Sequence, residues 1–196
     1  MGVLRQWLSH PWHRLAYIFR YSTVPTIHRE SVAEHTFFVM LWAYAMAIDL
    51  QDRGVNVSME LILRRALVHD FDEALTGDFI RTFKYSSREL HEAIVKETTS
   101  LMENLNAPRE LLIDWKDAKG LDVEGQVVAL ADHFSIVVYA IREVKLGNEF
   151  AGELLERLPK VIEGKTWDPR VRIYAEEAVR MANEASESKG EDRAEL

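Results

Sequence analysis

The chain of 196 residues contains no cysteine, which excludes disulfide bonds, thiolate metal sites and cysteine nucleophiles. Its formal net charge is −8, whereas a general binder of nucleic-acid polymers would normally present a basic face. No apolar run reaches the roughly 18 residues that cross a membrane, and no N-terminal segment has the pattern of a signal peptide. We therefore expect a cytoplasmic protein without a membrane or polymer partner. A small anionic ligand stays open, because a metal ion and one or two arginines can reverse the field locally.

The sequence shows neither internal repeats nor the alternation of apolar and polar residues that marks a half-exposed strand. Apolar residues instead recur at helical spacing, and the sequence predicts an all-α fold. We expect a single domain over residues 1–186, a charged, disordered tail over 187–196, and a solvated run over 149–156. Helices are predicted over residues 3–21, 31–50, 59–70, 86–104, 108–115, 123–145 and 168–184, with a loop over 22–30.

An apolar helical stretch over residues 61–68 runs directly into His69 and Asp70. Burying an imidazole and a carboxylate there is costly unless the charge has a partner, and a metal ion is a common strong partner. The alternative is a core histidine that its acidic neighbour caps. On a regular helix the two side chains diverge by about 100°, so they reach one ion together only near a helix end. The pattern places them at such an end.

Two further polar residues are unusual for their positions. Ser31 and Glu34 have the spacing of a capping box, which places His35 in the first turn of a helix. Asp132 interrupts the most apolar helix, where it is either a buried, partnered carboxylate or an exposed acid on an amphipathic helix. Together with the histidine–aspartate pair at the helix end, His35 and Asp132 supply two imidazoles and two carboxylates. That set suits a hard or borderline divalent transition metal with open positions for water and substrate.

The order of these candidates, His35, then His69-Asp70, then Asp132, resembles the H…HD…D signature of HD-domain metal-dependent phosphohydrolases. The resemblance implies an HD-domain helical bundle with the metal site at its centre. It also implies that His35, His69, Asp70 and Asp132 hold one divalent transition-metal cation, such as Co, Mn, Zn, Ni or Fe.

Three stretches narrow the resemblance to the bacterial 5′-deoxynucleotidases. Residues 20–21, 31–35 and 69–78 are similar to that branch's Arg-Trp pair, N-V-S-E-H run and H-D-x-x-E-x-x-T-G-D block, and the similarity covers about residues 4–145. Tyr21 departs from the tryptophan of the pair, which leaves base stacking and substrate preference open.

This narrower resemblance implies a reaction and a role for each residue. The substrate would be a deoxyribonucleoside 5′-monophosphate, hydrolysed to a deoxyribonucleoside and phosphate by a homodimer. Glu73 would transfer protons, Arg20 would hold the phosphate, and Tyr21 would pack against the sugar or base. Asp78 would accept the sugar 3′-hydroxyl and leave no room for a 2′-hydroxyl.

Two other functions stay open at this point. One is an HD phosphohydrolase that acts on another phosphomonoester, a cyclic nucleotide or a nucleotide alarmone. The other is a non-catalytic HD scaffold that binds a nucleotide or a partner. The complete ligand set and Glu73 count against the scaffold, while Arg20 and the sequence Thr76-Gly77-Asp78 favour the nucleotidase.

Overall fold

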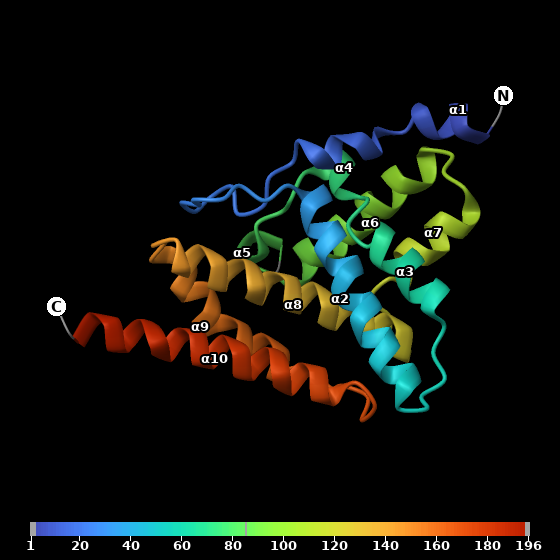
Figure 1. The fold of residues 1–196 in the computed structure, drawn as a ribbon. Helices are drawn as coiled ribbons and strands as arrows, with labels where there is room; N and C mark the ends of the chain where they lie inside the picture. The colour runs from blue at the N-terminus through green and yellow to red at the C-terminus, as the bar shows by residue number, and fades with distance from the viewer. Residues whose placement is uncertain (1–2, 85, 195–196) are drawn as a thin grey trace.

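Helices account for the regular structure in the part of the chain that the computed structural model describes, residues 3–84 and 86–194 (Figure 1). Within those residues no strand forms, and one isolated antiparallel bridge pairs Phe19 with Ser31. The predicted all-α fold is therefore confirmed. The same residues hold no helix that is both long enough and apolar enough to cross a membrane.

Three helices form the centre of the molecule, and each packs against the other two: α2 (Val32–Asp52), α3 (Met59–Val68) and α8 (Val123–Lys145). Their apolar faces meet in a core that includes the fully buried side chains of Leu50, Ile62 and Leu130. Residues three and four positions apart share a helix face, so the helical spacing of apolar residues in the sequence produces this core.

The helices α9 (Phe150–Glu163) and α10 (Arg172–Ala194) lie on one side of α8, and α6 (Arg88–Asn104) and α7 (Arg109–Lys116) lie on the other (Figure 1). The predicted solvated face over residues 149–156 forms only one side of α9, where Glu153 and Glu156 are exposed. Ala151 and Leu155 are buried, and Leu155 packs in a cluster with residues of α8 and α10. The charged residues of this run occupy one helix face and hide the apolar spacing of the other.

The last helix differs from its predicted bounds of 168–184 at both ends. Asp168 lies before α10, where its carboxylate accepts a hydrogen bond from Arg170 N (2.9 Å), and the helix continues to Ala194. The single domain over residues 1–186 and the disordered tail over 187–196 stay predictions. Residues 1–2 and 195–196 lie outside the described residues.

The predicted helix over residues 3–21 is wrong, because Pro11 divides it. The helix α1 (Val3–Leu8) ends before the proline, and a 3-10 helix, η1 (Pro11–Ala16), starts at it. Proline lacks a backbone N–H and its ring clashes with the preceding turn, so it is tolerated at the beginning of a helix but not inside it. The chain then forms a loop that the Phe19–Ser31 bridge closes before α2.

Between α3 and α6 the chain forms two short helices, α4 (Glu73–Thr76) and α5 (Arg81–Lys84). A second apolar cluster holds this segment against η1, α6 and α7. Its buried members include Leu15, Val68, Phe71, Ala74 and Met102. The polar residues that follow α3 are therefore anchored by buried apolar neighbours on both sides.

Candidate metal centre and its mouth

His35 lies in the first turn of α2, where the predicted capping box fixes the start of the helix. Ser31 Oγ accepts a hydrogen bond from Glu34 N (3.2 Å), and Glu34 Oε2 accepts one from Ser31 N (2.7 Å). The His35 side chain is fully buried, and its Nδ1 lies 3.1 Å from Ser135 Oγ on α8. These contacts leave His35 Nε2 facing the centre of the bundle.

His69 and Asp70 lie directly after the last residue of α3, at a helix end as predicted. His69 Nδ1 lies 2.7 Å from Ala66 O, and because a carbonyl only accepts, Nδ1 carries the proton and Nε2 presents a lone pair. Asp70 Oδ2 lies 3.0 Å from His69 Nε2 and 3.7 Å from His35 Nε2. Ligand atoms from these two histidines and Asp70 therefore lie within 4.8 Å of one another.

Asp132, the fourth predicted ligand, comes from the middle of α8. Its Oδ1 lies 3.1 Å from His35 Nε2, although the residue lies outside the compact group of three. The side chain is only 14% exposed, so Asp132 is not an acid on a solvated helix face. We call His35, His69, Asp70 and Asp132 the metal group.

His35 and the two aspartates of the metal group have pKa shifts that favour the protonation states of metal ligands. Burial, and next the charge of Arg20, lower the pKa of His35 to about 3, so its imidazole is neutral at pH 7. Burial alone would raise the pKa values of Asp70 and Asp132. The imidazoles and Lys119 nevertheless hold both pKa values well below the usual value of an aspartate. Among the described residues, neither histidine Nε2 finds a hydrogen bond of normal geometry. Two imidazole lone pairs beside two carboxylates fit a hard or borderline divalent cation.

Lys119 completes this arrangement, and sequence reasoning missed it. Its Nζ lies 2.7 Å from Asp132 Oδ2 and 3.4 Å from Asp70 Oδ1. The residue comes from the linker between α7 and α8, where Asp117, Lys119 and Asp122 give the pattern of a solvated turn. No spacing in that linker relates a lysine to a histidine or aspartate elsewhere in the chain.

Arg20 lies in the loop before α2, next to buried Glu30. The Nε of Arg20 is 3.8 Å from Glu30 Oε2, and the same oxygen is 4.0 Å from His35 Nδ1. Burial would lower the pKa of Arg20, but Tyr21 and nearby acidic groups, Asp132 among them, raise it, so the guanidinium stays charged. Burial raises the pKa of Glu30 to about 7, against the opposing charge of Arg20. Glu30 was not predicted, although its place beside the capping box was a signal.

Tyr21 has a positive φ of 59°, an uncommon conformation for a residue other than glycine. Its ring stacks on that of Tyr139 from α8, with centroids 4.8 Å apart and planes 10° from parallel. Tyr139 OH donates a hydrogen bond to His28 O (2.8 Å), in the same loop. The contact with α8 thus fixes the position of the Tyr21 ring.

Glu73 begins α4, and Asp78 follows a glycine whose φ of 74° turns the chain as predicted. The Asp78 carboxylate accepts a hydrogen bond from the backbone amide of Tyr21. Burial, and then the charges of Asp70 and Asp78, raise the pKa of Glu73 well above its usual value, and burial also raises that of Asp78. We call Arg20, Tyr21, Glu73 and Asp78 the mouth.

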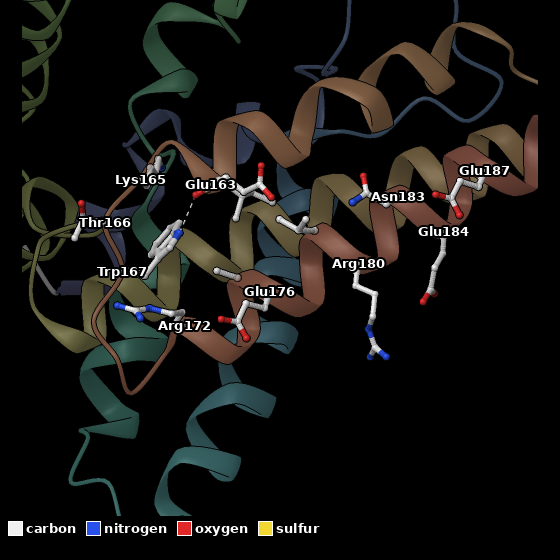
Figure 2. A pocket seen from close by; sticks show the side chains of 13 residues that line it. Glu163, Lys165, Thr166, Trp167, Arg172, Glu176, Arg180, Asn183, Glu184 and Glu187 are labelled. Atoms are coloured by element: carbon white, nitrogen blue, oxygen red, sulfur yellow. Dashed lines mark hydrogen bonds between the residues drawn. The ribbon is translucent and has the colours of Figure 1, made fainter.

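A groove of about 670 Å³ lies elsewhere, between the end of α9 and α10 (Figure 2). Ile162, Trp167, Ala175 and Val179 give it an apolar lining, and Trp167 Nε1 donates a hydrogen bond to Ile162 O (2.9 Å). No residue of the metal group or the mouth contributes to this groove. The groove is therefore separate from the candidate site.

Solved structures share this fold. An HD-domain phosphohydrolase of Listeria innocua matches with a TM-score of 0.71 at 24% identity, over 92% of this chain and 85% of that one. The HD phosphohydrolase DatZ of cyanophage S-2L, solved with dA and one catalytic Zn²⁺ bound, matches with a TM-score of 0.64 at 18% identity, over 90% of this chain and 96% of that one. The helical bundle of this chain is therefore the fold of HD-domain proteins.

Sequence comparison narrows this class to a family. The profile described as 5′-deoxynucleotidase YfbR-like matches residues 9–181. A 5′-deoxynucleotidase of Photorhabdus laumondii is 30% identical over 158 residues, which cover 76% of this chain and 79% of the relative. The chain belongs to the YfbR-like 5′-deoxynucleotidase family.

Proposed function

We propose that the protein hydrolyses deoxyribonucleoside 5′-monophosphates to a deoxyribonucleoside and phosphate, with one divalent transition metal held by the metal group. One observation carries this proposal: Asp78 is hydrogen-bonded to the Tyr21 backbone, and Arg20 lies near the aspartates of the metal group. A phosphate-binding cation and a sugar-binding carboxylate therefore adjoin one candidate metal site. The bound dA and Zn²⁺ of the cyanophage relative support the same interpretation.

His35, His69, Asp70 and Asp132 would hold the ion. When bound, such a metal polarises a phosphoryl oxygen and lowers the pKa of a water molecule. The imidazoles are held in place from behind: the Nδ1 of His69 is bonded to Ala66 O, and that of His35 lies beside Ser135 Oγ. Such supporting contacts orient ligands and affect metal affinity.

Arg20 would bind the phosphate through its paired N–H donors, which match the geometry of phosphate oxygens. Glu73 would donate its proton to the departing 5′-oxygen, because burial and the charges of Asp70 and Asp78 raise the pKa of this carboxyl and so favour its protonated form. The bond from phosphorus to the 5′-oxygen breaks as a bond forms to the attacking water. The proton that this water loses returns to Glu73.

Asp78 would select the sugar. A carboxylate fixed by the Tyr21 amide can accept a hydrogen bond from a 3′-hydroxyl, and an added 2′-hydroxyl against it would be excluded. The stacked ring of Tyr21 would pack against the sugar or base, in the place that similar enzymes give to tryptophan.

A phosphate-release assay tests the proposal. It compares deoxyribonucleoside 5′-monophosphates with the ribonucleoside 5′-monophosphates and the 3′-monophosphates, after chelator treatment and addition of Co²⁺, Mn²⁺ or Zn²⁺. The deoxy 5′-forms should be hydrolysed roughly ten- to a hundredfold faster than the ribo forms. Equal rates would reject sugar selection and favour an HD phosphohydrolase with another phosphorylated substrate.

We also propose that the protein is a homodimer, by its resemblance to the bacterial enzymes. Light scattering should then give a mass near twice the 22.6 kDa of the chain. A mass near that of one chain would exclude the dimer.

A further inference from the structure

The position of Lys119 relative to the two aspartates is specific. Asp132 faces His35 with Oδ1 and Lys119 with Oδ2, while Asp70 faces the histidines with Oδ2 and Lys119 with Oδ1. Each carboxylate therefore faces the histidines with one oxygen and pairs with the same ammonium through the other. Lys119 bridges the carboxylates on the side away from the histidines.

The backbone that carries Lys119 is fixed to the start of α8. Gly120 follows it, and a Cβ built at Gly125 would lie 2.5 Å from Gly120 N, so the two backbones touch. Asp122 accepts a hydrogen bond from Gly125 N (2.8 Å) and pairs with Arg65 NH1 at 2.7 Å. The linker is thus held in place by α3 and α8, and the lysine lies at the metal group because of this packing.

The side chain itself is less confined than its backbone. Lys119 is 36% exposed, whereas Asp70 and Asp132 are 16% and 14% exposed. A lysine is a compact charge on a flexible four-carbon stem. The exposed part of the side chain leaves the ammonium room to move away from the carboxylates without a change in the linker.

The charge balance of the site changes when a divalent ion is bound. The ion alone neutralises the two carboxylates, because both imidazoles of the metal group are uncharged ligands. Lys119 and Arg20 then remain as two positive charges beside the metal group. A phosphate monoester carries up to two negative charges, so the two cations match it.

We infer that Lys119 is the counter-ion of the metal group in the metal-free protein, where it neutralises Asp70 and Asp132. Once the metal is bound, Lys119 contacts the substrate phosphate instead. The first half concerns the chain and its metal alone. The second half rests on the proposed function, because it requires a phosphate-bearing substrate.

The variants Lys119→Met and Lys119→Gln test both halves, with Lys116→Met as the matched control. Lys116 lies on α7, is 44% exposed and pairs with Glu103 Oε1 at 2.7 Å, so it is a surface lysine of the same segment. Chelator-treated protein is titrated with Mn²⁺ by calorimetry, and its melting temperature is measured with and without Mn²⁺.

Removal of the ammonium should make Mn²⁺ bind about tenfold more tightly or better, because the ion no longer displaces a resident charge. The metal-free variants should also melt several degrees lower, since the two carboxylates lose their partner, and Mn²⁺ should restore them. Lys116→Met should match the unmodified protein. Unchanged or weaker Mn²⁺ binding in both Lys119 variants would overturn the first half.

The second half of the inference is tested by titrating Mn²⁺-saturated protein with inorganic phosphate. Both Lys119 variants should bind phosphate roughly tenfold more weakly, and unchanged binding would overturn the contact with phosphate. Neither titration uses a nucleotide. If both titrations behave as expected and no deoxyribonucleoside monophosphate is hydrolysed, the proposed function fails and the first half of the inference stands.

Discussion

The metal group and the mouth are built in different ways. The four residues of the metal group lie on α2 and α8 or directly after α3, the helices whose apolar faces form the main core. The mouth comes from a loop before α2 and from the irregular segment after α3. Helix packing therefore fixes the first, while contacts between distant loops and α8 fix the second.

Glu143 shows how the loop of the mouth is held. Its buried carboxylate on α8 accepts hydrogen bonds from Ile27 N (2.8 Å) and His28 N (2.7 Å). Asn148 Nδ2 donates to Pro25 O (2.9 Å). We therefore expect metal binding and substrate choice to be separable, because different parts of the chain carry the metal group and the mouth. Variants in each part test this separation.

The largest effect is expected from a change inside the metal group. His69→Ala or Asp70→Ala should lose bound metal and lower phosphate release by at least about a hundredfold, because the remaining ligands no longer neutralise the ion. Mass spectrometry measures the bound metal, and a phosphate assay measures the rate of release. The variant His13→Ala, at an exposed histidine, is the control. Full metal content in either variant would remove that residue from the site.

A change in the mouth should leave the metal bound. Asp78→Ala should keep its metal but lose turnover or the preference for deoxy substrates, since Asp78 lies outside the metal group. The loss of a hydrogen bond to a charged acceptor costs about 1.5–3 kcal/mol, or roughly ten- to a hundredfold. The rates of phosphate release from each deoxy substrate and its ribo counterpart measure this loss. Asp117→Ala, at an exposed aspartate, is the control. Loss of metal in Asp78→Ala would contradict the separation.

A smaller effect is expected from the support of the loop. Glu143→Gln cannot accept hydrogen bonds from both backbone amides, so the free energy of unfolding should fall by about 1–3 kcal/mol. The KM should rise, while metal affinity stays unchanged. Denaturant unfolding measures the free energy of unfolding, kinetics measure the KM, and a metal titration measures the metal affinity. A KM equal to that of the unmodified protein would show that the mouth does not depend on this anchor.

The smallest effect depends on pH. Burial raises the folded-state pKa of Glu30 from 4.5 to about 7, so ionised Glu30 lowers stability above pH 7. Glu30→Gln removes this penalty and should stabilise the metal-free protein by about 1–3 kcal/mol at pH 8. The gain should shrink as the pH falls through 7 toward 4.5. A gain that does not vary with pH, or one shared by exposed Glu97→Gln, would refute the effect of burial.

The same division separates what the sequence could predict from what it could not. The capping box at Ser31 placed His35, and the end of an apolar helix placed His69 and Asp70, because these signals are local to one helix. Lys119 and Glu143 could not be found this way. Their partners lie on other elements, and neither residue belongs to a motif.

The errors in the predicted secondary structure have local causes. The helix predicted over residues 3–21 ignored the effect of Pro11, and the charged face of α9 concealed its buried face. Neither error moved the predicted ligands, because both regions lie outside α2, α3 and the part of α8 that carries Asp132. The positions of the predicted ligands on or beside the core helices were therefore predicted more completely than the course of the chain around them.

The central claim is that the metal group holds one ion on which activity depends. Chelator-treated protein is titrated with Mn²⁺ or Co²⁺, and bound metal and phosphate release from a deoxyribonucleoside 5′-monophosphate are measured in the same samples. We expect release to rise in proportion to bound metal and to reach its maximum at one ion per chain. Full activity in the metal-free protein, or metal binding without any gain in activity, would contradict the account.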